Sequence, residues 1–383
     1  MTGLPPAVPE APAAYDAILL TSFGGPEGQD DVIPYLRNVT RGRGIPDERL
    51  EEVAHHYRHF GGVSPINDQN RALRAALVAE LAARGLDLPV YWGNRNWDPY
   101  LRDAVREAYD AGHRRLLAVV TSAYSSYSSC RQYREDLAAA LEETGLAGEM
   151  HIDKVRQYFD HPGFVTPFVE GVRDALARAR DALGPDADPA RDLHVLFATH
   201  SIPMTTATTS GPPGADLGPD GAYGAQHRAV AEVVMASVAS GADVGSGVGP
   251  AVPWSLVYQS RSGAPSTPWL EPDINDAIGE LAAQGVRGVV IVPLGFVSDH
   301  MEVLWDLDEE ALTTARDAGL WAERVPTPGV HPEYVAGLVD LVTERTAGAP
   351  RPALTPLGPW YDVCRPGCCA NPRGARPAVA GSD

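Results

Sequence analysis

The chain alternates short, uninterrupted apolar runs with longer segments that have a helical period. The apolar runs begin at Asp16, Leu88, Arg115, Leu193, Trp254 and Gly288. Runs without polar alternation are typical of strands buried on both faces of a parallel sheet. Segments 69–85 and 273–285 repeat apolar residues every few positions, which predicts amphipathic helices. Strand–helix alternation of this kind indicates an α/β fold built from right-handed βαβ units.

The apolar runs fall into two groups, before and after about residue 160. We therefore predict two similar α/β domains with parallel sheets, residues 14–160 and 161–345. Residues 346–383 are rich in proline and glycine and form a C-terminal extension. Ligands of open parallel sheets bind beyond the carboxyl ends of the strands, so we expect the functional residues there.

Composition narrows the class of protein. Of the 383 residues 44% are hydrophobic, enough for a sizeable core, and the formal net charge is −19. The negative charge argues against non-specific binding to nucleic acid or anionic membranes. No apolar stretch approaches the ~18 residues of a membrane span, and the N-terminus lacks the basic and apolar regions of a signal peptide. We expect a cytoplasmic protein with no membrane span and no nucleic-acid partner.

The stretch LFATHSIPM places His200 at the end of a predicted buried strand. A lone histidine there is more often a hydrogen-bonded structural residue. Further along, Glu302, Asp306 and Glu310 recur every four residues, which on a helix puts the carboxylates in one row. No lysine or arginine lies between Asp299 and Glu310. The row is either a solvated acidic face or a track for a divalent cation, because hard cations prefer carboxylate oxygens and imidazole suits iron.

Two loops carry polar side chains suited to a flat ligand with polar edges. HHYRHFGGVSPIND contains Ser64 in a turn set by glycine and proline, and TSAYSSYSSCRQY, which contains Tyr133, follows a predicted strand. Each is also typical of an ordinary loop. The cysteines of the chain are Cys130, Cys364, Cys368 and Cys369. Three of them crowd together in the extension, which indicates a metal or cluster site, because disulfides are rare in cytosolic proteins.

Taken together, these motifs make the chain resemble the ferrochelatase family along nearly its whole length, from about Ala17 to the C-terminus. The resemblance is carried by LLTSFGGPEG, YLRNVTRGRGIP, HYRHFGGVSPIND, TSAYSSYSSCRQY, ATHSIP, VYQSRSGAPSTPWLEPDI and VPLGFVSDHMEVLWDLDEEA. Their order and spacing are more specific than any single motif. The Cys-bearing loop and tail look like the actinobacterial type, which the resemblance assigns to coproporphyrin III.

The resemblance implies two Rossmann-like domains with an active-site cleft between them. The implied reaction is insertion of Fe²⁺ into coproporphyrin III, giving Fe-coproporphyrin in haem biosynthesis. His200 and Glu302 match the facing catalytic residues of the iron site. Asp306 and Glu310 match a row of carboxylates that feeds or holds the metal.

Other matches concern the porphyrin. The residues that match porphyrin-binding positions are Phe23, Arg41, His56, Tyr57, Ser64 and Tyr133. Phe23 stands where some relatives carry a tyrosine that can ligate the product iron. The carboxylates of coproporphyrin also require cationic or hydrogen-bonding groups, for which Arg43 and Arg58 are further candidates.

The resemblance also implies a [2Fe–2S] cluster, since some ferrochelatases hold one with one internal and three C-terminal cysteines. The ligands here would be Cys130, Cys364, Cys368 and Cys369. Such a cluster would fix the extension to the first domain. A set of four cysteines also suits structural zinc, and unligated thiols are the remaining alternative.

Other functions stay open at this point. They are a protoporphyrin IX ferrochelatase, another tetrapyrrole metal chelatase, and a non-catalytic porphyrin or haem carrier. A carrier has no use for a row of carboxylates, which favours an enzyme. Whether His200 acts as a base or as an iron ligand is also open. We expect a monomer that makes transient contact with the next enzyme of the haem pathway.

Overall fold

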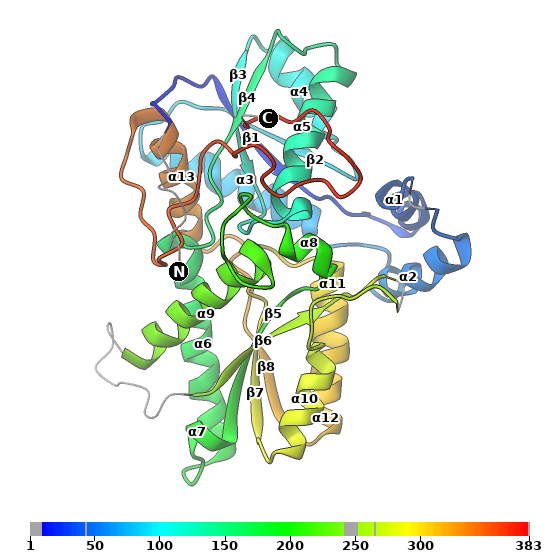
Figure 1. The fold of residues 1–383 in the computed structure, drawn as a ribbon, viewed down its shortest axis with the longest axis vertical. Coiled ribbons are helices and arrows are strands. Elements are labelled where there is room, and N and C mark those ends of the chain that lie inside the picture. The colour runs from blue at the N-terminus through cyan, green and yellow to red at the C-terminus, as the bar shows by residue number, and fades with distance from the viewer. Residues whose placement is uncertain (1–9, 43, 241–251, 264–265, 382–383) are drawn as a thin grey trace.

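The computed structural model describes residues 10–42, 44–240, 252–263 and 266–381, and its frame is two parallel sheets at opposite ends of the molecule (Figure 1). The first sheet has the order β2 (Val90–Asn94), β1 (Ala17–Ser22), β3 (Arg115–Val120), β4 (His151–Lys154). The second has the order β6 (Trp254–Gln259), β5 (Leu193–His200), β7 (Gly288–Val292), β8 (Trp321–Arg324). The second sheet repeats the order of the first. This confirms the predicted α/β fold with two similar parallel-sheet halves.

The strands β4 and β8 are missing from the predicted set. Each is four residues long and lies at the edge of its sheet, and their sequences HIDK and WAER contain charged residues. An edge strand has only one neighbouring strand and commonly carries charged side chains. The continuous apolar run that marks the other strands is therefore absent.

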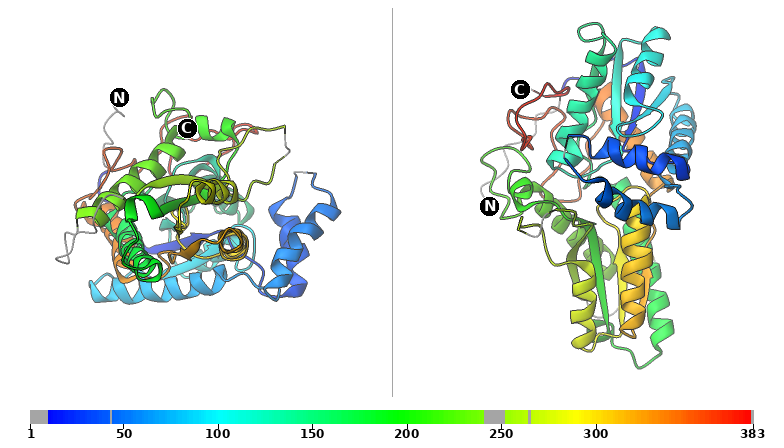
Figure 2. Two further views of the ribbon diagram at one scale, coloured as in Figure 1. Left: turned by 90° about the horizontal axis from the view of Figure 1, so that it is seen from below. Right: turned by 90° about the vertical axis from the view of Figure 1, so that its right-hand side faces the viewer.

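Helices cover both faces of each sheet, as the side view of Figure 2 shows. Alternate residues of β1 belong to different core clusters, so this strand is buried on both sides. On the first sheet α3 (Ile66–Ala83) covers one face, and α4 (Leu101–Asp110) and α5 (Gln132–Glu143) cover the other. On the second, α6 (Pro162–Leu183) and α9 (Gly221–Ser240) oppose α10 (Ile274–Ala283) and α12 (Leu312–Asp317). The predicted helices at 69–85 and 273–285 correspond to α3 and α10.

The remaining helical elements lie mostly in the connections. The α-helices are α1 (Val32–Val39), α2 (Asp47–His59), α7 (Pro189–Asp192), α8 (Met204–Thr208), α11 (Met301–Val303) and α13 (Pro332–Ala347). A short 3₁₀ turn is η1 (Gln29–Asp31), and the π-helical segments are η2 (Tyr127–Arg131) and η3 (Leu304–Ala311). Figure 1 shows α1 and α2 projecting to one side of the molecule. No helix in the described ranges is long and apolar enough to cross a membrane.

One core joins the two halves. The largest cluster of buried apolar side chains includes residues of β1 and α3 in the first half and of β5, β7 and α9 in the second. Helix α13 packs against both α6 and α3. Where α13 crosses α6, Gly163 lies so close that a Cβ there would be 2.4 Å from the carbonyl oxygen of Glu333. The halves are therefore not separate bodies with independent cores.

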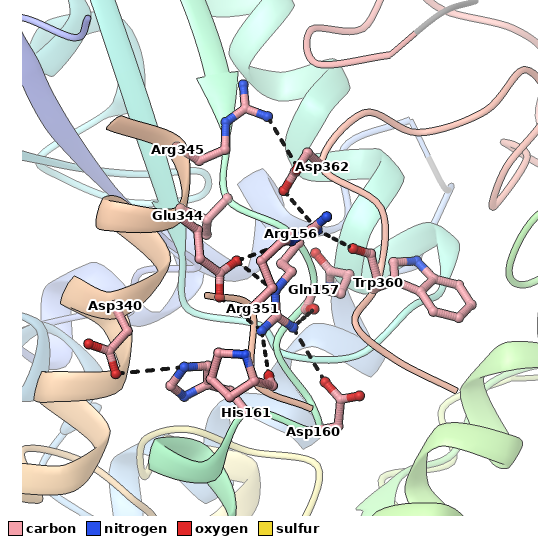
Figure 3. Close-up of polar contacts among 12 residues, drawn as sticks. Arg156, Gln157, Asp160, His161, Asp340, Glu344, Arg345, Arg351, Trp360 and Asp362 are labelled. Atoms are coloured by element: carbon pink, nitrogen blue, oxygen red, sulfur yellow. Dashed lines mark hydrogen bonds and ion pairs between the residues drawn. The ribbon is translucent and has the colours of Figure 1, made fainter. Parts of the chain in front are cut away.

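The extension beyond α13 is held by buried ion pairs (Figure 3). Arg156 Nε lies 2.8 Å from Glu344 Oε2 on α13, and both side chains are almost fully buried. Arg351 of the extension donates to Asp362 at 3.1 Å, and Arg156 also donates to the backbone carbonyl of Pro352 at 2.9 Å. Of these contacts, the bond from Arg156 to Pro352 ties the extension to the segment that follows β4, and the Arg351–Asp362 pair lies within the extension.

Candidate functional site

The carboxyl end of β5 presents His200 to one side of the molecule. Its backbone lies opposite Gln259 in the register of β5 and β6. The ring Nδ1 donates to the carbonyl of Ser201, and Nε2 lies 3.6 Å from Oε1 of Glu302. The side chains of His200 and Glu302 are 32% and 49% exposed. The two predicted catalytic residues therefore lie together, at a place that solvent reaches.

The start of α11 fixes Glu302. The ring of His300 caps this helix, and its Nδ1 accepts from the backbone N–H of Glu302 at 3.2 Å. The amide of Gln259 donates to the backbone carbonyl of Glu302 at 3.1 Å and to the carboxylate of Asp306 at 3.3 Å. The hydroxyl of Ser260 also donates to Asp306. Gln259 thus connects the ends of β5 and β6 to the acidic segment.

The acidic segment carries Glu302, Asp306 and Glu310. It begins in α11 and continues as the π-helix η3, which runs from Leu304 to Ala311. The spacing predicts a helix there but does not reveal its type. Single π-turns inserted in helices are rare and are found most often at functional sites. Glu310 accepts from the indole N–H of Trp305 at 2.8 Å. Burial and the charges of Glu302 and Glu310 raise the pKa of Asp306, so the three carboxylates interact electrostatically.

The His200–Glu302 pair is charged in the free protein. Burial alone would lower the pKa of His200, but the Glu302 carboxylate and the Ser201 carbonyl raise it to about 9. Burial would raise the pKa of Glu302, but the positive charge of His200 lowers it to about 2. Burial and the charge of Glu302 raise the pKa of Asp306 to about 7. Near neutral pH His200 is therefore protonated, and Asp306 exchanges its proton.

The first half reaches this site through an apolar cluster. Met301, next to Glu302, packs with Tyr35 and Tyr57, and Phe23 packs against the same group. Burial and the charge of Glu302 raise the pKa of Tyr57, which places its phenol near the carboxylate. Phe23 and Tyr57, two predicted porphyrin-binding residues, therefore lie close to the predicted iron site.

His56 makes a different contact from the one expected. Its ring stacks on Trp305 with a centroid distance of 4.0 Å and an interplanar angle of 8°. His55 and His59 meet the same indole edge-on at 6.0 and 5.6 Å. This histidine face of α2 therefore packs on the acidic segment.

Ser64 and Tyr133 are buried. The backbone N–H of Ser64 donates to the carbonyl of Pro26 at 2.9 Å, and its Cβ leaves no room for a side chain at Gly25. Arg95 lies over the ring of Tyr133 at 4.4 Å and over that of Phe23 at 5.5 Å. Sequence reasoning missed Arg95, although its position directly after the apolar run YWGN was a usable signal.

Two other predicted cationic residues, Arg41 and Arg58, contact polar neighbours at the surface. Arg41 donates to the side chain of Asn38 at 2.6 Å on the surface. Arg58 pairs with Glu51 at 2.6 Å, and both side chains are exposed. Arg43 lies outside the described residues.

The cysteines gather in one buried cluster, made of Cys130, Cys364, Cys368 and Cys369. All are reduced, with sulfur–sulfur distances of 3.9 Å for Cys130–Cys364 and 4.0 Å for Cys368–Cys369. Hydrogen bonds from Cys130 and Cys368 lower the pKa of the Cys364 thiol well below its usual value. No group of three or more His, Cys, Asp or Glu in the described ranges has the arrangement of a metal site. The geometry therefore gives the predicted [2Fe–2S] cluster no support of its own.

Comparisons with known proteins agree along almost the whole chain. A family model described as Ferrochelatase matches residues 15–346. The Coproporphyrin III ferrochelatase of Leifsonia xyli subsp. xyli is 67% identical over 379 residues, with 97% of this chain and 95% of that protein covered. That of Streptomyces griseus subsp. griseus is 54% identical over 380 residues, with 97% of each covered. A protein of Rhodopirellula baltica named Ferrochelatase is 49% identical over 384 residues, with 100% and 98% covered.

Proposed function

Because the chain belongs to the ferrochelatase family, we propose that it inserts Fe²⁺ into coproporphyrin III to give Fe-coproporphyrin. The observation that carries the proposal is the His200–Glu302 pair at the carboxyl end of β5, with Asp306 beside it. Similar proteins named for coproporphyrin III support the choice of porphyrin. His200 and Glu302 are the proposed catalytic residues.

The chemistry requires a route for protons. Fe²⁺ replaces the two pyrrole N–H protons of the ring, so two protons must leave for each metal inserted. A cation near His200 lowers the pKa of its imidazolium. In our proposal the arriving Fe²⁺ expels that proton, and Nε2 then accepts a pyrrole proton or contacts the metal. Asp306, with a pKa of about 7, takes up and releases protons near neutral pH.

The acidic segment is the proposed metal path. Carboxylate oxygens suit hard divalent cations, and Glu302, Asp306 and Glu310 supply three carboxylates on consecutive turns. Glu310, which accepts from Trp305, would be the outer member and Glu302 the inner one. This division gives each carboxylate a different expected effect on turnover and on the apparent affinity for Fe²⁺.

The porphyrin contacts are proposals of the same kind. Phe23 and Tyr57 would contact the ring, since they belong to the apolar group around Met301. The other proposed contacts are Arg41, His56, Ser64 and Tyr133. His56 would have to leave its stack on Trp305, or contact the substrate from that position.

The four cysteines are the proposed ligands of a [2Fe–2S] cluster. Reduced, buried sulfur atoms fit an all-thiolate ligand set, and the nearby charges of Arg134 and Lys154 lower the pKa of Cys364. A bound cluster would supply two sulfide-bridged irons and link Cys130 to the extension. Zinc and unligated thiols are the competing states.

Metal and sulfide analysis tests the cluster. Protein purified without oxygen should contain two irons and two sulfides per chain, and Cys130→Ser should lose both and unfold at a lower temperature. Ser128→Ala, in the same loop, is the control and should keep the iron. A zinc-loaded protein, or a stable metal-free one, would reject the cluster and leave the chelatase proposal intact.

The function is tested by an anaerobic assay. Purified protein receives Fe²⁺ and either coproporphyrin III or protoporphyrin IX, and the absorption bands of the metalloporphyrin are followed. We expect faster metal insertion into coproporphyrin III. Faster insertion into protoporphyrin IX would contradict the substrate, and porphyrin binding without insertion would indicate a carrier. Parallel assays with Co²⁺, Ni²⁺ and Zn²⁺ test the metal.

The proposed organisation completes the picture. Residues 14–160 and 161–345 would be the two Rossmann-like domains, and residues 346–383 the extension packed on the first. The repeated strand order supports this division. We propose a cytoplasmic monomer that passes its product to the next enzyme of the haem pathway in a transient contact.

A further inference from the structure

A buried group of polar side chains lies directly behind His200. Tyr223 and His227, one turn apart on α9, face Thr199 on β5, and all three residues are buried. The hydroxyl of Tyr223 lies 2.9 Å from the backbone carbonyl of His200 and 2.8 Å from Oγ1 of Thr199. Nε2 of His227 lies 3.0 Å from the same Oγ1.

The protons in this group can be assigned from the acceptors. Nδ1 of His227 lies 2.7 Å from the backbone carbonyl of Tyr223, so this nitrogen must donate. Burial lowers the pKa of His227 to about 3, so the ring is neutral and Nε2 accepts. Thr199 therefore donates its single hydroxyl proton to His227. Tyr223 is left as the donor, and its single hydroxyl proton is shared between Thr199 Oγ1 and the His200 carbonyl.

This donor acts on the peptide group directly before the one that orients the imidazole. The peptide between His200 and Ser201 is held at its carbonyl by Tyr223 and at its N–H by the carbonyl of Gln259, at 2.8 Å. The ring Nδ1 of His200 in turn donates to the carbonyl of Ser201. The direction of Nε2 toward Glu302 therefore depends on two consecutive peptide groups, and Tyr223 holds the first of them.

Helix α9 is itself anchored in the first half. Gln226 accepts from the backbone N–H of Ser125 at 2.8 Å and donates to its hydroxyl at 3.0 Å. The ring of His227 stacks on Tyr124 with a centroid distance of 3.6 Å and an interplanar angle of 12°. The loop after β3 thus holds α9 in place, and α9 in turn holds the end of β5 through Tyr223.

We infer that Tyr223 is a positioning residue for the reaction: its hydroxyl bond to the His200 carbonyl keeps Nε2 of His200 opposite Glu302. The inference rests on the proposed function for its catalytic consequence. The geometry of the free protein is independent of that function. Thr199 and His227 contribute indirectly. Because Thr199 donates its proton to His227, the Tyr223 hydroxyl can only act as a donor.

The test is Tyr223→Phe, which keeps the ring and removes the hydroxyl. We expect kcat for Fe²⁺ insertion to fall about tenfold, the factor expected for one buried hydrogen bond of about 1.4 kcal/mol, while KM for coproporphyrin III stays within twofold. Tyr334→Phe is the matched control. It removes a buried hydroxyl contact, 3.2 Å from Tyr158, on α13. It should lower stability similarly and leave kcat unchanged.

A second readout needs no activity. Hydrogen exchange at the Ser201 amide should be at least tenfold faster in Tyr223→Phe than in wild type and Tyr334→Phe. This separates failure of the inference from failure of the proposed function, because the peptide is measured in the protein alone. Unchanged exchange, or an unchanged kcat in a protein that inserts iron, would overturn the role of Tyr223.

Thr199→Val covers the case in which Tyr223→Phe does not fold. It removes a hydroxyl from the same group but leaves the bond from Tyr223 to His200. We expect it to lower stability while kcat stays within threefold and Ser201 exchange stays slow. A tenfold loss of kcat in folded Thr199→Val would assign the effect to the buried group as a whole and overturn the specific role of Tyr223.

Discussion

At the scale of single residues, the direction of one imidazole decides what the site can do. The carbonyl of Ser201 takes the proton of Nδ1 and leaves Nε2 of His200 as the nitrogen that faces Glu302. The sequence places His200 at a strand end, but it contains no signal for this tautomer. The protonated state of the pair arises from contacts between residues a hundred positions apart, so it was not predictable either.

His200→Ala should abolish metal insertion, with a fall in kcat of at least a thousandfold, because it removes the imidazole that pairs with Glu302. The fold should survive, since the side chain is 32% exposed and fills no core position. Turnover is measured by the metalloporphyrin bands and folding by circular dichroism. Turnover close to wild type in a folded variant would contradict both the base and the ligand role.

The carboxylates should differ in their effects. Glu302→Gln should lower kcat by orders of magnitude, because it removes the charge that stabilises the His200 imidazolium. Asp306→Asn and Glu310→Gln should mainly raise the Fe²⁺ concentration needed for half-maximal rate. Glu309→Gln, an exposed carboxylate of the same segment that faces His59, is the control and should be silent. If Asp306→Asn and Glu310→Gln are equally silent, the row is not a metal path.

At the scale of elements, much of the arrangement follows from the apolar pattern. Uninterrupted runs correctly mark six of the eight strands in the described residues, and the polar residues after β5 place His200 where the proposed site lies. The edge strands β4 and β8 are not predicted, because charged residues interrupt their apolar pattern. The π-helical winding of η3 is not predicted, because residue spacing does not distinguish helix types. The stack of His56 on Trp305 depends on how α2 meets η3, which no local pattern encodes.

The crossing of α6 and α13 gives a prediction at this scale. Gly163→Ala would place a Cβ 2.4 Å from the Glu333 carbonyl and 2.8 Å from Cα of Gly337, and backbone atoms of a packed helix cannot move cheaply. We expect a loss of about 1–3 kcal/mol in the free energy of unfolding, measured in urea. Gly279→Ala is the control, because this exposed helical glycine has nothing within 4 Å. That change should stabilise by about 0.5–1 kcal/mol, and a neutral Gly163→Ala would show that the crossing adjusts.

At the scale of the whole molecule, buried charges connect the halves and the extension. Arg156 meets Glu344 of α13, and Arg345 of α13 meets Asp362 of the extension (Figure 3). Near them, burial and the charge of Arg156 lower the pKa of His161 to about 4, and its side chain is 3% exposed. The buried ring is therefore neutral in the folded protein and titrates at its ordinary value near 6.5 when unfolded.

This difference predicts an acid sensitivity. The folded state disfavours protonation of His161. The neutral ring therefore costs the free energy of unfolding nothing above about pH 6.5, and the free energy of unfolding decreases as pH falls from there toward 4. Between pH 7 and pH 5 the loss from this residue should be about 2 kcal/mol. His161→Asn keeps an acceptor for the N–H of Gly163 at the start of α6 and removes the titrating ring. Urea unfolding at both pH values should show a smaller loss in the variant, and an equal loss would contradict the assignment.

The crossing of the chain over itself has a consequence for its synthesis. The buried partners of Arg156 are supplied by Glu344 and by the carbonyl of Pro352, almost two hundred residues later. Tyr334, Leu338 and Trp360 belong to the same core as Leu20 of the first strand. On the ribosome, the N-terminal half emerges long before these residues exist. It must wait with Arg156 lacking Glu344 and Pro352, and with an uncovered apolar surface, until residues 334–360 are translated. The core that the two halves share is therefore completed only after both halves have been synthesised.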